Sequence, residues 1–408
     1  MPDAAPSLAT VLEAEIAARG PIPFARFMEL CLYHPRFGYY TRGLGGGGGR
    51  DYVTSSGLHR AFGALVARQA EEMWRRLGRP EPFLFVEFGP GEGFFAADFL
   101  GEAGRREGFA RALRYLLVET SPVLAARQKA RLAGRAAVRP AWVTEEELEA
   151  RSGFTGCLFA NEVVDAFPVH RVVGTAEGPR EIHVTLRDGR LAEEILPLSG
   201  DAVARFLAEA EIAPEAGQEV DLNLAAPCWL AWALGLLKRG YGLIVDYGHE
   251  ASELYRPARR RGTLLAYHRH RVHEDFLSEP GEQDLTAHVD FTALRRAAET
   301  AGARVIGAVS QARFLLALGA LEFLREDGAE PGLLQAGASI ERLRDREALK
   351  ELILPDRMGE KFTVLAIGVG DVSRDLTGLR EPWTRGRETA AAREERTPAG
   401  PPGEDRHG

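Results

Sequence analysis

Leu84-Phe85-Val86-Glu87-Phe88-Gly89-Pro90-Gly91-Glu92-Gly93-Phe94-Phe95 is the stretch of the sequence that decides the fold. An apolar run is followed by three glycines at alternate positions, and then by a new apolar segment. This order predicts a buried parallel strand, a tight turn and the beginning of a helix. Glycine lets a backbone approach a ligand closely because it has no Cβ, and a helix N-terminus offers free N–H groups to an anionic group. The stretch therefore predicts a ligand-binding turn that follows a parallel strand.

The spacing of the glycines bears on the ligand. Dinucleotide-binding folds favour G-x-G-x-x-G after the strand, but here the third glycine comes one residue early, as Gly89, Gly91 and Gly93. Because Glu87 lies two residues before the first glycine, the pattern is E-x-G-x-G-x-G, which is typical of S-adenosylmethionine (SAM) methyltransferases. An ordinary glycine-rich turn is the alternative, since short motifs also match by chance.

The composition excludes several classes of protein. With 408 residues the chain can bury a large core and form more than one structural unit. The net charge of −8 argues against a nucleic acid partner, which needs a basic surface. The three cysteines form no C-x-x-C pair, so we predict neither a metal site nor a disulfide framework.

The sequence also bears on location. No run of about 18 apolar residues occurs, so no membrane span is expected. Residues 1–20 lack the basic start and apolar centre of a signal peptide, and they are more acidic than a typical transit peptide. We therefore expect a cytoplasmic protein.

The periodicity of apolar residues predicts an α/β chain in three parts. Residues 1–79 form an N-terminal helical cap or substrate region, 80–370 a Rossmann-like domain with an insertion at about 172–237, and 371–408 a disordered tail rich in Pro, Gly, Arg and Glu. The insertion begins with a hairpin over 172–196, and 252–288 is rich in loops. Strands are expected at 83–88, 113–119, 141–143, 156–160, 242–247, 304–309 and 361–369.

Glu119 is a candidate cofactor ligand. It ends the second expected strand, where a carboxylate can accept hydrogen bonds from both hydroxyls of a ribose. The alternative is that Glu119 caps the turn Thr120-Ser121-Pro122, because these residue types favour helix caps.

Polar residues also follow the apolar strand expected at 156–160. Asn161, Glu162 and Asp165 come directly after it, and the carboxyl edge of an open α/β sheet is where ligands bind. We therefore take this segment as part of the functional site.

The chain resembles the MidA-like class I SAM-dependent methyltransferases, a family that includes the mitochondrial assembly factor for respiratory complex I. The resemblance extends over about residues 8–370. The segments that carry it are 27–35, 38–40, 51–55, 87–93, 118–119, 121–122, 160–162, 165–169, 246–249 and 284–291. The chain departs from the family pattern at Ser56-Gly57 and in the five glycines of 45–49, which puts the identity of the substrate in doubt.

The resemblance implies a seven-stranded methyltransferase sheet, SAM as the cofactor and a protein partner as substrate. The mitochondrial member is associated with symmetric dimethylation of an arginine in a complex I subunit, and a homodimer is also considered. The cofactor-binding residues that we expect are Glu87, Gly89, Pro90, Gly91, Gly93, Glu119 and Asn161.

An arginine acceptor carries a delocalised positive charge and planar donors, so it favours carboxylates. Glu162 and Asp165 lie three residues apart and face the same way if a helical turn follows the strand. With Asn161 they are the predicted catalytic residues, and Asp246 and His249 are second candidates. The alternative is that Glu162 and Asp165 cap a turn and orient Asn161.

Two other functions remain open at this point. One is an NAD-type oxidoreductase, which the glycine spacing disfavours. The other is a non-catalytic assembly or binding factor that retains the SAM-binding fold.

Overall fold

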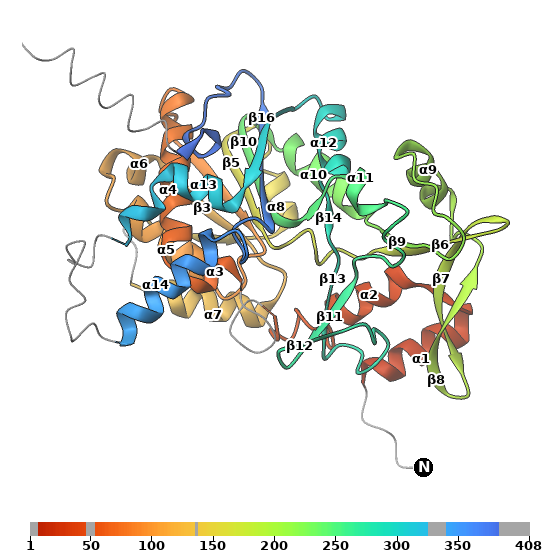
Figure 1. The fold of residues 1–408 in the computed structure, drawn as a ribbon. Coiled ribbons are helices and arrows are strands. Elements are labelled where there is room, and N and C mark those ends of the chain that lie inside the picture. Colours follow the sequence, from red (N-terminus) through yellow and green to blue (C-terminus); the bar gives the residue numbers. More distant parts are fainter. Residues whose placement is uncertain (1–6, 46–53, 135–137, 325–339, 383–408) are drawn as a thin grey trace, which may run out of the picture.

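The computed structural model describes residues 7–45, 54–134, 138–324 and 340–382. Its centre is an eight-stranded sheet, seven strands of which follow in the order β15-β16-β10-β5-β2-β3-β4 (Figure 1). The five strands from β10 to β4 are parallel, and β16 is antiparallel to both of its neighbours. The expected α/β fold with a seven-stranded sheet is confirmed. The strands are β2 (Phe83–Phe88), β3 (Leu113–Val118), β4 (Ala141–Val143), β5 (Phe154–Asn161), β10 (Leu237–His249), β14 (Val289–Asp290, beside the end of β10), β15 (Arg304–Ser310) and β16 (Phe362–Val369).

Helices cover both faces of this sheet, which explains why all six residues of β2 are buried and why all of them except Glu87 are apolar. One face carries α4 (Ala61–Arg76), α5 (Phe94–Ala103), α6 (Glu107–Ala112), α7 (Pro122–Leu132), α13 (Gln311–Leu318), η1 (Ala320–Glu322) and α14 (Ile340–Ile353). The other face carries α8 (Glu145–Glu149), α10 (Ala225–Gly235) and α12 (Phe291–Thr300).

Aromatic packing fixes α5 against the sheet, and thereby the glycine turn that precedes it. The ring of Phe85 in β2 lies 4.3 Å from that of Phe99, and Phe95 stacks on Phe159 of β5, also at 4.3 Å between centroids. Such ring pairs add specific geometry to the area that they bury. The turn between β2 and α5 is therefore held at both of its ends.

The predicted N-terminal unit 1–79 is divided in the structure. Helix α4 packs on the central sheet, because Phe62, Leu65 and Met73 belong to its core. Helices α1 (Leu8–Arg19) and α2 (Phe24–Tyr33) instead share a separate core with the inserted sheet. The short helix α3 (Ser55–Leu58) connects to α4.

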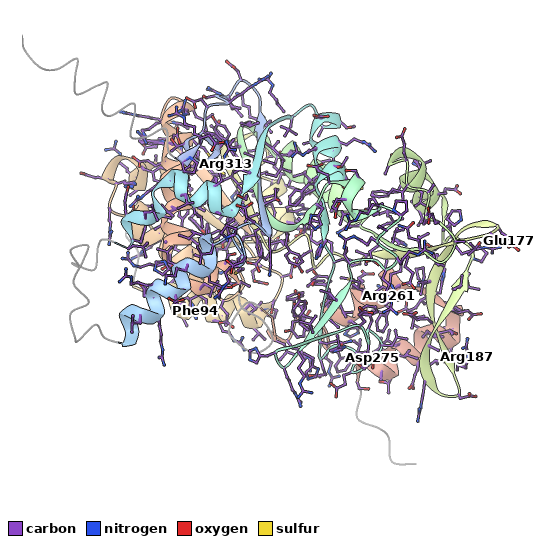
Figure 2. The ribbon with its side chains drawn as sticks, viewed as in Figure 1. Phe94, Glu177, Arg187, Arg261, Asp275 and Arg313 are labelled. Atoms are coloured by element: carbon purple, nitrogen blue, oxygen red, sulfur yellow. The ribbon has the colours of Figure 1, made fainter. Side chains whose placement is uncertain are left out.

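The insertion extends over 170–222 rather than 172–237, since α10 packs on the central sheet. The expected hairpin is part of a five-stranded antiparallel sheet, and α9 (Asp201–Glu209) packs beside it. In Figure 1 this sheet, α1 and α2 form the right-hand lobe. Its strands are β1 (Ile22–Pro23), β6 (His170–Thr175), β7 (Gly178–Arg187), β8 (Arg190–Leu196) and β9 (Glu219–Leu222). Figure 2 labels Glu177 and Arg187 at the outer edge of this lobe, far from Phe94 in the lobe of the central sheet.

Part of the segment predicted to be rich in loops folds into a small sheet. Strands β12 (Arg271–His273), β11 (Leu265–His268) and β13 (Asp284–Thr286) pair antiparallel in this order, after α11 (Ala251–Leu254). The first two strands are joined by Arg269 and His270, both with positive φ. They are only three and four residues long, which is too short to show an alternation of apolar and polar residues. This is why apolar alternation did not indicate them.

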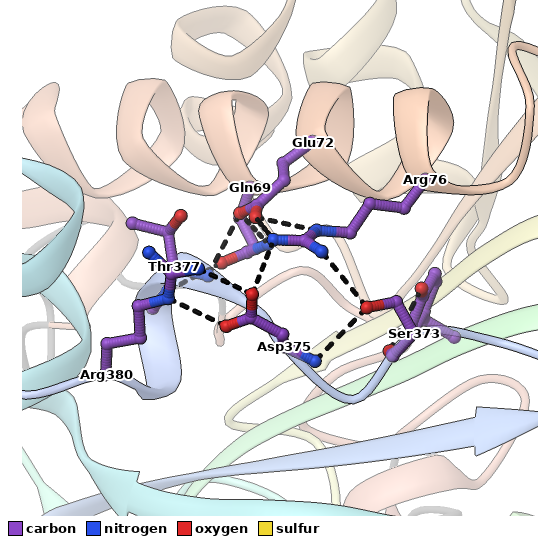
Figure 3. Close-up of polar contacts among 9 residues, drawn as sticks. Gln69, Glu72, Arg76, Ser373, Asp375, Thr377 and Arg380 are labelled. Atoms are coloured by element: carbon purple, nitrogen blue, oxygen red, sulfur yellow. Dashed lines mark hydrogen bonds and ion pairs between the residues drawn. The ribbon is translucent and has the colours of Figure 1, made fainter. Parts of the chain in front are cut away.

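The segment 371–382, predicted to begin a disordered tail, packs against α4 (Figure 3). Its η2 turn (Thr377–Leu379) receives support from the fully buried Gln69, whose Oε1 accepts from the N–H of Gly378 at 2.8 Å. Arg76 bonds to Ser373 and Asp375. Because Leu376 is also buried, this segment is part of the core, and the remainder of the predicted tail lies outside the described residues.

Four of the five glycines of 45–49 also lie outside the described residues. Within the described ranges, no helix combines the length and the apolar character that crossing a bilayer requires.

Candidate active site

The glycine turn after β2 has a backbone that other residues adopt only at a cost. Gly89, Gly91 and Gly93 have φ values of +59°, +54° and +77°. A Cβ on Gly89 would lie 2.8 Å from Cγ2 of Val163, which is closer than van der Waals contact. Gly93 is the N-cap of α5 and has no side chain to satisfy the N–H groups of the first turn. These N–H groups are therefore available to a polar ligand.

A cavity of about 380 Å³, the first cavity, opens beside this turn. The expected cofactor residues Glu87, Gly89, Pro90, Gly91, Glu119 and Asn161 all line it. Gly93 is not among its lining residues and instead begins α5. Tyr33, Tyr40 and Trp229 line it as well, and only the first two lie in segments that carried the family resemblance.

Glu119 contacts both the cavity and the turn that follows β3. Its Oε1 accepts from the N–H of Ser121 at 2.7 Å, and its Oε2 accepts from Nε2 of Gln128 at 2.8 Å. The same Gln128 nitrogen donates to the carbonyl of Gly91 at 2.7 Å, so it ties Glu119 to the glycine turn. A carboxylate has about four acceptor positions, so Glu119 retains capacity for a hydroxyl ligand. Glu119 can therefore both cap the turn after β3 and bind a ribose, so the two interpretations from the sequence do not exclude each other.

Glu87 forms the buried floor of the first cavity. The hydroxyl of Tyr115 donates to its Oε2 at 2.6 Å. Burial raises the pKa of Glu87 to about 8, against which this hydrogen bond acts. A cationic ligand bound in the cavity would lower that pKa again, because a nearby positive charge favours the carboxylate. The donors and carboxylates around the first cavity therefore fit SAM, which has hydroxyl, ammonium and sulfonium groups.

The turn after β5 is held by Asp246, at the end region of the adjacent strand β10. Its Oδ2 accepts from the N–H groups of Val163, Val164 and Asp165 at 3.3, 3.0 and 3.3 Å. Its Oδ1 accepts from the N–H of Tyr247 at 2.9 Å. Asp246 is fully buried and lines neither the first cavity nor the second cavity described below. Its side chain therefore caps the turn after β5. The second-choice prediction that Asp246 contacts the acceptor does not agree with this geometry.

Glu162 occupies the strained position of that turn. Its φ of +54° lies in the left-handed region, which is uncommon for a residue with a long side chain. Its Oε1 accepts from the N–H of Ser55 at 2.9 Å and from Nδ2 of Asn161 at 3.1 Å. Burial raises the pKa of Glu162 to about 8, and the Ser55 N–H opposes this shift.

A second cavity, of about 860 Å³, lies on the other side of Glu162. Glu162 lines both cavities, whereas Asp165 and His249 line only the second. Sequence reasoning missed most of its other walls, which come from the end of β10, from β11, from β13 and the residues after it, and from α14. They include Tyr247, Tyr267, Asp284, Thr286 and His288, with Glu347, Ala348 and Glu351 of α14.

The inside of the second cavity is acidic. Oδ1 of Asp165 is buried and has no hydrogen-bond partner among the described residues. Burial raises the pKa of Asp165 to about 6, with the Tyr247 hydroxyl acting in the opposite direction. Burial also lowers the pKa of His288 to about 4, so that its ring is neutral at pH 7. A buried acceptor without a donor beside two other carboxylates, Glu162 and Asp284, favours a cationic ligand with N–H groups.

Tyr40 separates the two cavities. Its hydroxyl donates to Oδ1 of Asp284 at 2.8 Å, across 244 positions of the chain. Its ring stacks on that of Tyr33 at 5.6 Å, and the Tyr33 hydroxyl donates to the carbonyl of Ala166. The aromatic segment around residue 40 therefore connects the cofactor side with the acidic side. Across the described residues, no group of His, Cys, Asp and Glu is arranged to hold a metal ion.

Glu162→Gln is expected to raise the melting temperature at alkaline pH. The folded pKa of Glu162 is about 8 against an ordinary 4.5, so between these values the folded state holds a proton that the unfolded state releases. Stability therefore falls as pH rises through this window, and Gln removes that loss. Scanning calorimetry from pH 5 to pH 9 should give a difference that grows to about 2–4 °C at pH 8. A difference that shrinks as pH rises would contradict the assigned burial.

Comparison with known proteins agrees with this geometry. Residues 65–309 match a family model of S-adenosyl-L-methionine-dependent methyltransferases. A relative from Drosophila melanogaster, named protein arginine methyltransferase NDUFAF7 homolog, mitochondrial, is 30% identical over 406 residues, which cover 91% of this chain and 86% of the relative. The Homo sapiens protein arginine methyltransferase NDUFAF7 is 28% identical and covers 86% of this chain and 81% of its own length.

A solved structure gives the same result. A candidate methyl transferase from Burkholderia thailandensis, bound to S-adenosyl-homocysteine, superposes with a TM-score of 0.79 at 34% identity. The match covers 92% of this chain and 95% of that one. SAM is therefore the cofactor class that fits the first cavity, in agreement with the sequence prediction.

The predicted cytoplasmic location is wrong by the same comparison. The relatives from Drosophila melanogaster, Rattus norvegicus and Homo sapiens are mitochondrial proteins. The acidity of residues 1–20, on which the prediction depended, does not outweigh this finding.

Proposed function

Because the chain belongs to the MidA-like family of SAM-dependent methyltransferases, we propose that it methylates an arginine side chain of a protein partner. The observation that carries the proposal is the acidic second cavity, which meets the cofactor cavity at Glu162. The names of the relatives as protein arginine methyltransferases support the choice of acceptor. By the family resemblance, a subunit of a respiratory complex is the first partner to test.

The walls of the second cavity suit a guanidinium better than an ammonium. A guanidinium is planar, always charged, and presents five N–H donors in a fixed arrangement, whereas an ammonium is a compact point charge. Glu162 and Asp165 offer carboxylate oxygens to such donors, and Oδ1 of Asp165 has no hydrogen-bond partner in the part of the chain that the structure describes. The rings of Tyr247 and Tyr267 add aromatic faces, on which guanidinium groups stack.

Each group then has a separate task in the reaction. SAM, when bound, supplies a methyl group on a sulfonium. The glycine turn, Glu119 and Asn161 hold the cofactor on one side, with Asn161 also bonded to Glu162, and Asp165 orients the acceptor nitrogen on the other. Alignment of the two reactants lowers the barrier by pre-organising them. Glu162 accepts the proton that the nitrogen loses as the N–C bond forms, and a pKa of about 8 suits a base near neutral pH.

A non-catalytic binding factor is the second candidate. Such a factor would retain the first cavity to bind SAM. It would not need the second cavity, where Oδ1 of Asp165 has no hydrogen-bond partner among the described residues. The burial of Glu162 and Asp165 raises their pKa values, which means that ionising them in the folded protein costs free energy. Buried carboxylates of this kind are retained mainly where a function uses them.

The test is transfer of a labelled methyl group. The purified chain and methyl-labelled SAM are added to an extract of cells that lack the gene, and the hydrolysed proteins are separated into amino acids. We expect label in methylarginines with the wild type and none with Glu162→Gln. Label in methyllysine or methyl esters would contradict the arginine acceptor, and no label in protein would favour the binding factor.

Ala348→Trp should separate the two cavities. Ala348 lies on α14 and lines only the second cavity, so a large side chain there obstructs the acceptor and not the cofactor. We expect methyl transfer to fall at least about tenfold, since misplacing the acceptor by about 1 Å already costs more. Calorimetry should give an unchanged Kd for SAM. Equal loss of both quantities would mean that the second cavity is not the acceptor site.

A further inference from the structure

A chain of hydrogen bonds runs through the interior from α14 to Glu162. Gln311, the first residue of α13, is fully buried, and its Nε2 donates to the carbonyl of Leu352 in α14 at 3.1 Å. Its Oε1 accepts from Oγ of Ser55 at 3.0 Å. The N–H of Ser55, also fully buried, donates to Oε1 of Glu162 at 2.9 Å. Three helices that are distant in sequence are thereby connected to one carboxylate.

Both ends of this chain belong to the second cavity. Helix α14 supplies Glu347, Ala348 and Glu351 to its wall, and Leu352 is the next residue along that helix. The other end is Glu162, where the two cavities meet. The position of the cavity wall is therefore linked to the position of the carboxylate by two buried bonds and one that is partly buried.

We propose that Ser55 and Gln311 are positioning residues for methyl transfer, which hold the Glu162 carboxylate between the two cavities and tie it to α14. The role in methyl transfer rests on the proposed function, whereas the hydrogen bonds themselves do not depend on it. Glu162 needs such support because its backbone is in the left-handed region. Asn161, in the same turn, also donates a hydrogen bond to its carboxylate.

A purely structural glutamine explains these bonds less well. Burying an amide costs free energy that only well-made hydrogen bonds offset, and an apolar side chain of similar shape avoids that cost. Gln311 uses its two polar atoms on two different elements, α14 and α3. These two hydrogen bonds fix the position of α3 relative to α14, and an apolar contact would fix it less strictly.

The ionisation of Glu162 reports whether the chain of bonds is intact. The Ser55 N–H favours its charged form, while burial and the carboxylate of Asp165 favour the neutral form. Asp246 from β10 also faces this group. The other titratable groups around the second cavity are Asp284, Tyr247, Tyr267, His249, His288, Glu347, Glu351, Arg357 and Lys361, and those around the first cavity are Glu87, Glu119, Glu145, Tyr33 and Tyr40. None of them changes when Ser55 or Gln311 is replaced by an uncharged residue.

A probe for this ionisation needs no acceptor. Glu162 lines the first cavity, so its charge favours cationic SAM over the neutral thioether S-adenosyl-homocysteine. The ratio of the two Kd values, measured by calorimetry from pH 6 to pH 9.5, should change with a midpoint near pH 8 in the wild type. Glu87 titrates in the same range, so the part due to Glu162 is the change that Glu162→Gln removes. The variants are Ser55→Ala, which removes the bond between Ser55 Oγ and Gln311, and Gln311→Met, which also removes the bond to Leu352 at nearly constant volume.

Gln69→Met is the matched control. Gln69 is fully buried like Gln311, but it supports the C-terminal segment at α4 and takes no part in the site (Figure 3). All three variants should lose some thermal stability, since each leaves buried polar groups unpaired. Only Ser55→Ala and Gln311→Met should shift the midpoint, upward by about one pH unit. Both keep the Ser55 N–H, but they release Ser55 from Gln311 and so weaken its support of the charged carboxylate.

Two results would overturn the inference: a wild-type ratio that does not vary with pH, or a midpoint in both variants equal to that of Gln69→Met. If Gln311→Met does not fold, Ser55→Ala gives the answer, because it removes only a hydroxyl. The outcome is separate from that of the proposed function. A shifted midpoint without arginine methylation by the wild type would leave the positioning role and remove the acceptor assignment.

Discussion

Glu162→Gln is expected to reduce methyl transfer by about 10²–10⁴-fold, the usual contribution of a positioned general base. Gln keeps the shape of the side chain and the oxygen that accepts from Ser55 and Asn161. It removes the charge that attracts the acceptor and the basicity that takes its proton. The loss should therefore appear in the rate of transfer from bound SAM, measured in a single turnover.

The affinity for SAM should change little in the same variant. The glycine turn, Glu87 and Glu119 line the first cavity, and the substitution leaves them intact. We expect the Kd to rise by less than about tenfold, since one charge in a partly solvated site contributes modestly. A Kd raised as much as the rate is lowered would assign Glu162 to the cofactor alone.

Glu351→Gln is the control for Glu162→Gln. Glu351 is another carboxylate that lines the second cavity, but it lies on α14 and is paired with Arg357. Its replacement should leave the rate within about twofold, because exposed ion pairs contribute little. Equal effects of the two substitutions would mean that overall charge matters, and not the place of Glu162.

Gly89→Val is expected to weaken SAM binding by about 10²-fold. Its φ of +59° is unfavourable for a β-branched residue, and the new Cβ would lie 2.8 Å from Val163. Strain of about 1–3 kcal/mol is typical of such positions, and relieving it moves the turn that forms the cofactor cavity. Calorimetry with SAM, after circular dichroism has shown a folded sample, measures the effect.

Gly101→Val makes the same substitution where it should be tolerated. Gly101 lies in α5, a few turns beyond the glycine turn, and a Cβ there meets no atom within 4 Å. Valine and glycine have similar, modest helix propensities, so SAM affinity should be unchanged. Loss of binding in both variants would indicate that α5 as a whole, and not the turn, is sensitive.

The local sequence was sufficient to predict the structure where the pattern of a single segment determines it. Strand β2 has the predicted bounds, because its apolar run is limited by proline on one side and glycine on the other. Glu119 and Asn161 could be found because they directly follow apolar strands, and the carboxyl edge of a parallel sheet brings such residues together. The same rule gave Glu162 its place beside the cofactor cavity.

The second cavity could not be predicted in the same way. Its wall joins the turn after β5, the small sheet β11–β13 and α14, and no periodicity indicates that these segments meet. Asp246 illustrates the difficulty. A carboxylate at the end of a strand can contact a ligand or satisfy backbone N–H groups, and the four N–H groups that it binds are visible only in three dimensions.

Which structural unit a helix or segment joins is hard to predict for a related reason. Residues 61–76 have an amphipathic pattern that predicts a helix, but the pattern does not state which sheet the helix covers. Likewise, the segment 371–382 has few apolar residues, and its order depends on hydrogen bonds to Gln69 and Arg76, which are some 300 positions away.

The measurement that tests the two-cavity account most directly is a crystal structure of this chain with S-adenosyl-homocysteine and a short arginine peptide. We predict density for the nucleoside beside Glu119 in the first cavity. The guanidinium should lie in the second cavity, within hydrogen-bond distance of Glu162 and Asp165. An arginine side chain bound outside the second cavity, or a guanidinium separated from Glu162 by ordered protein, would contradict the account.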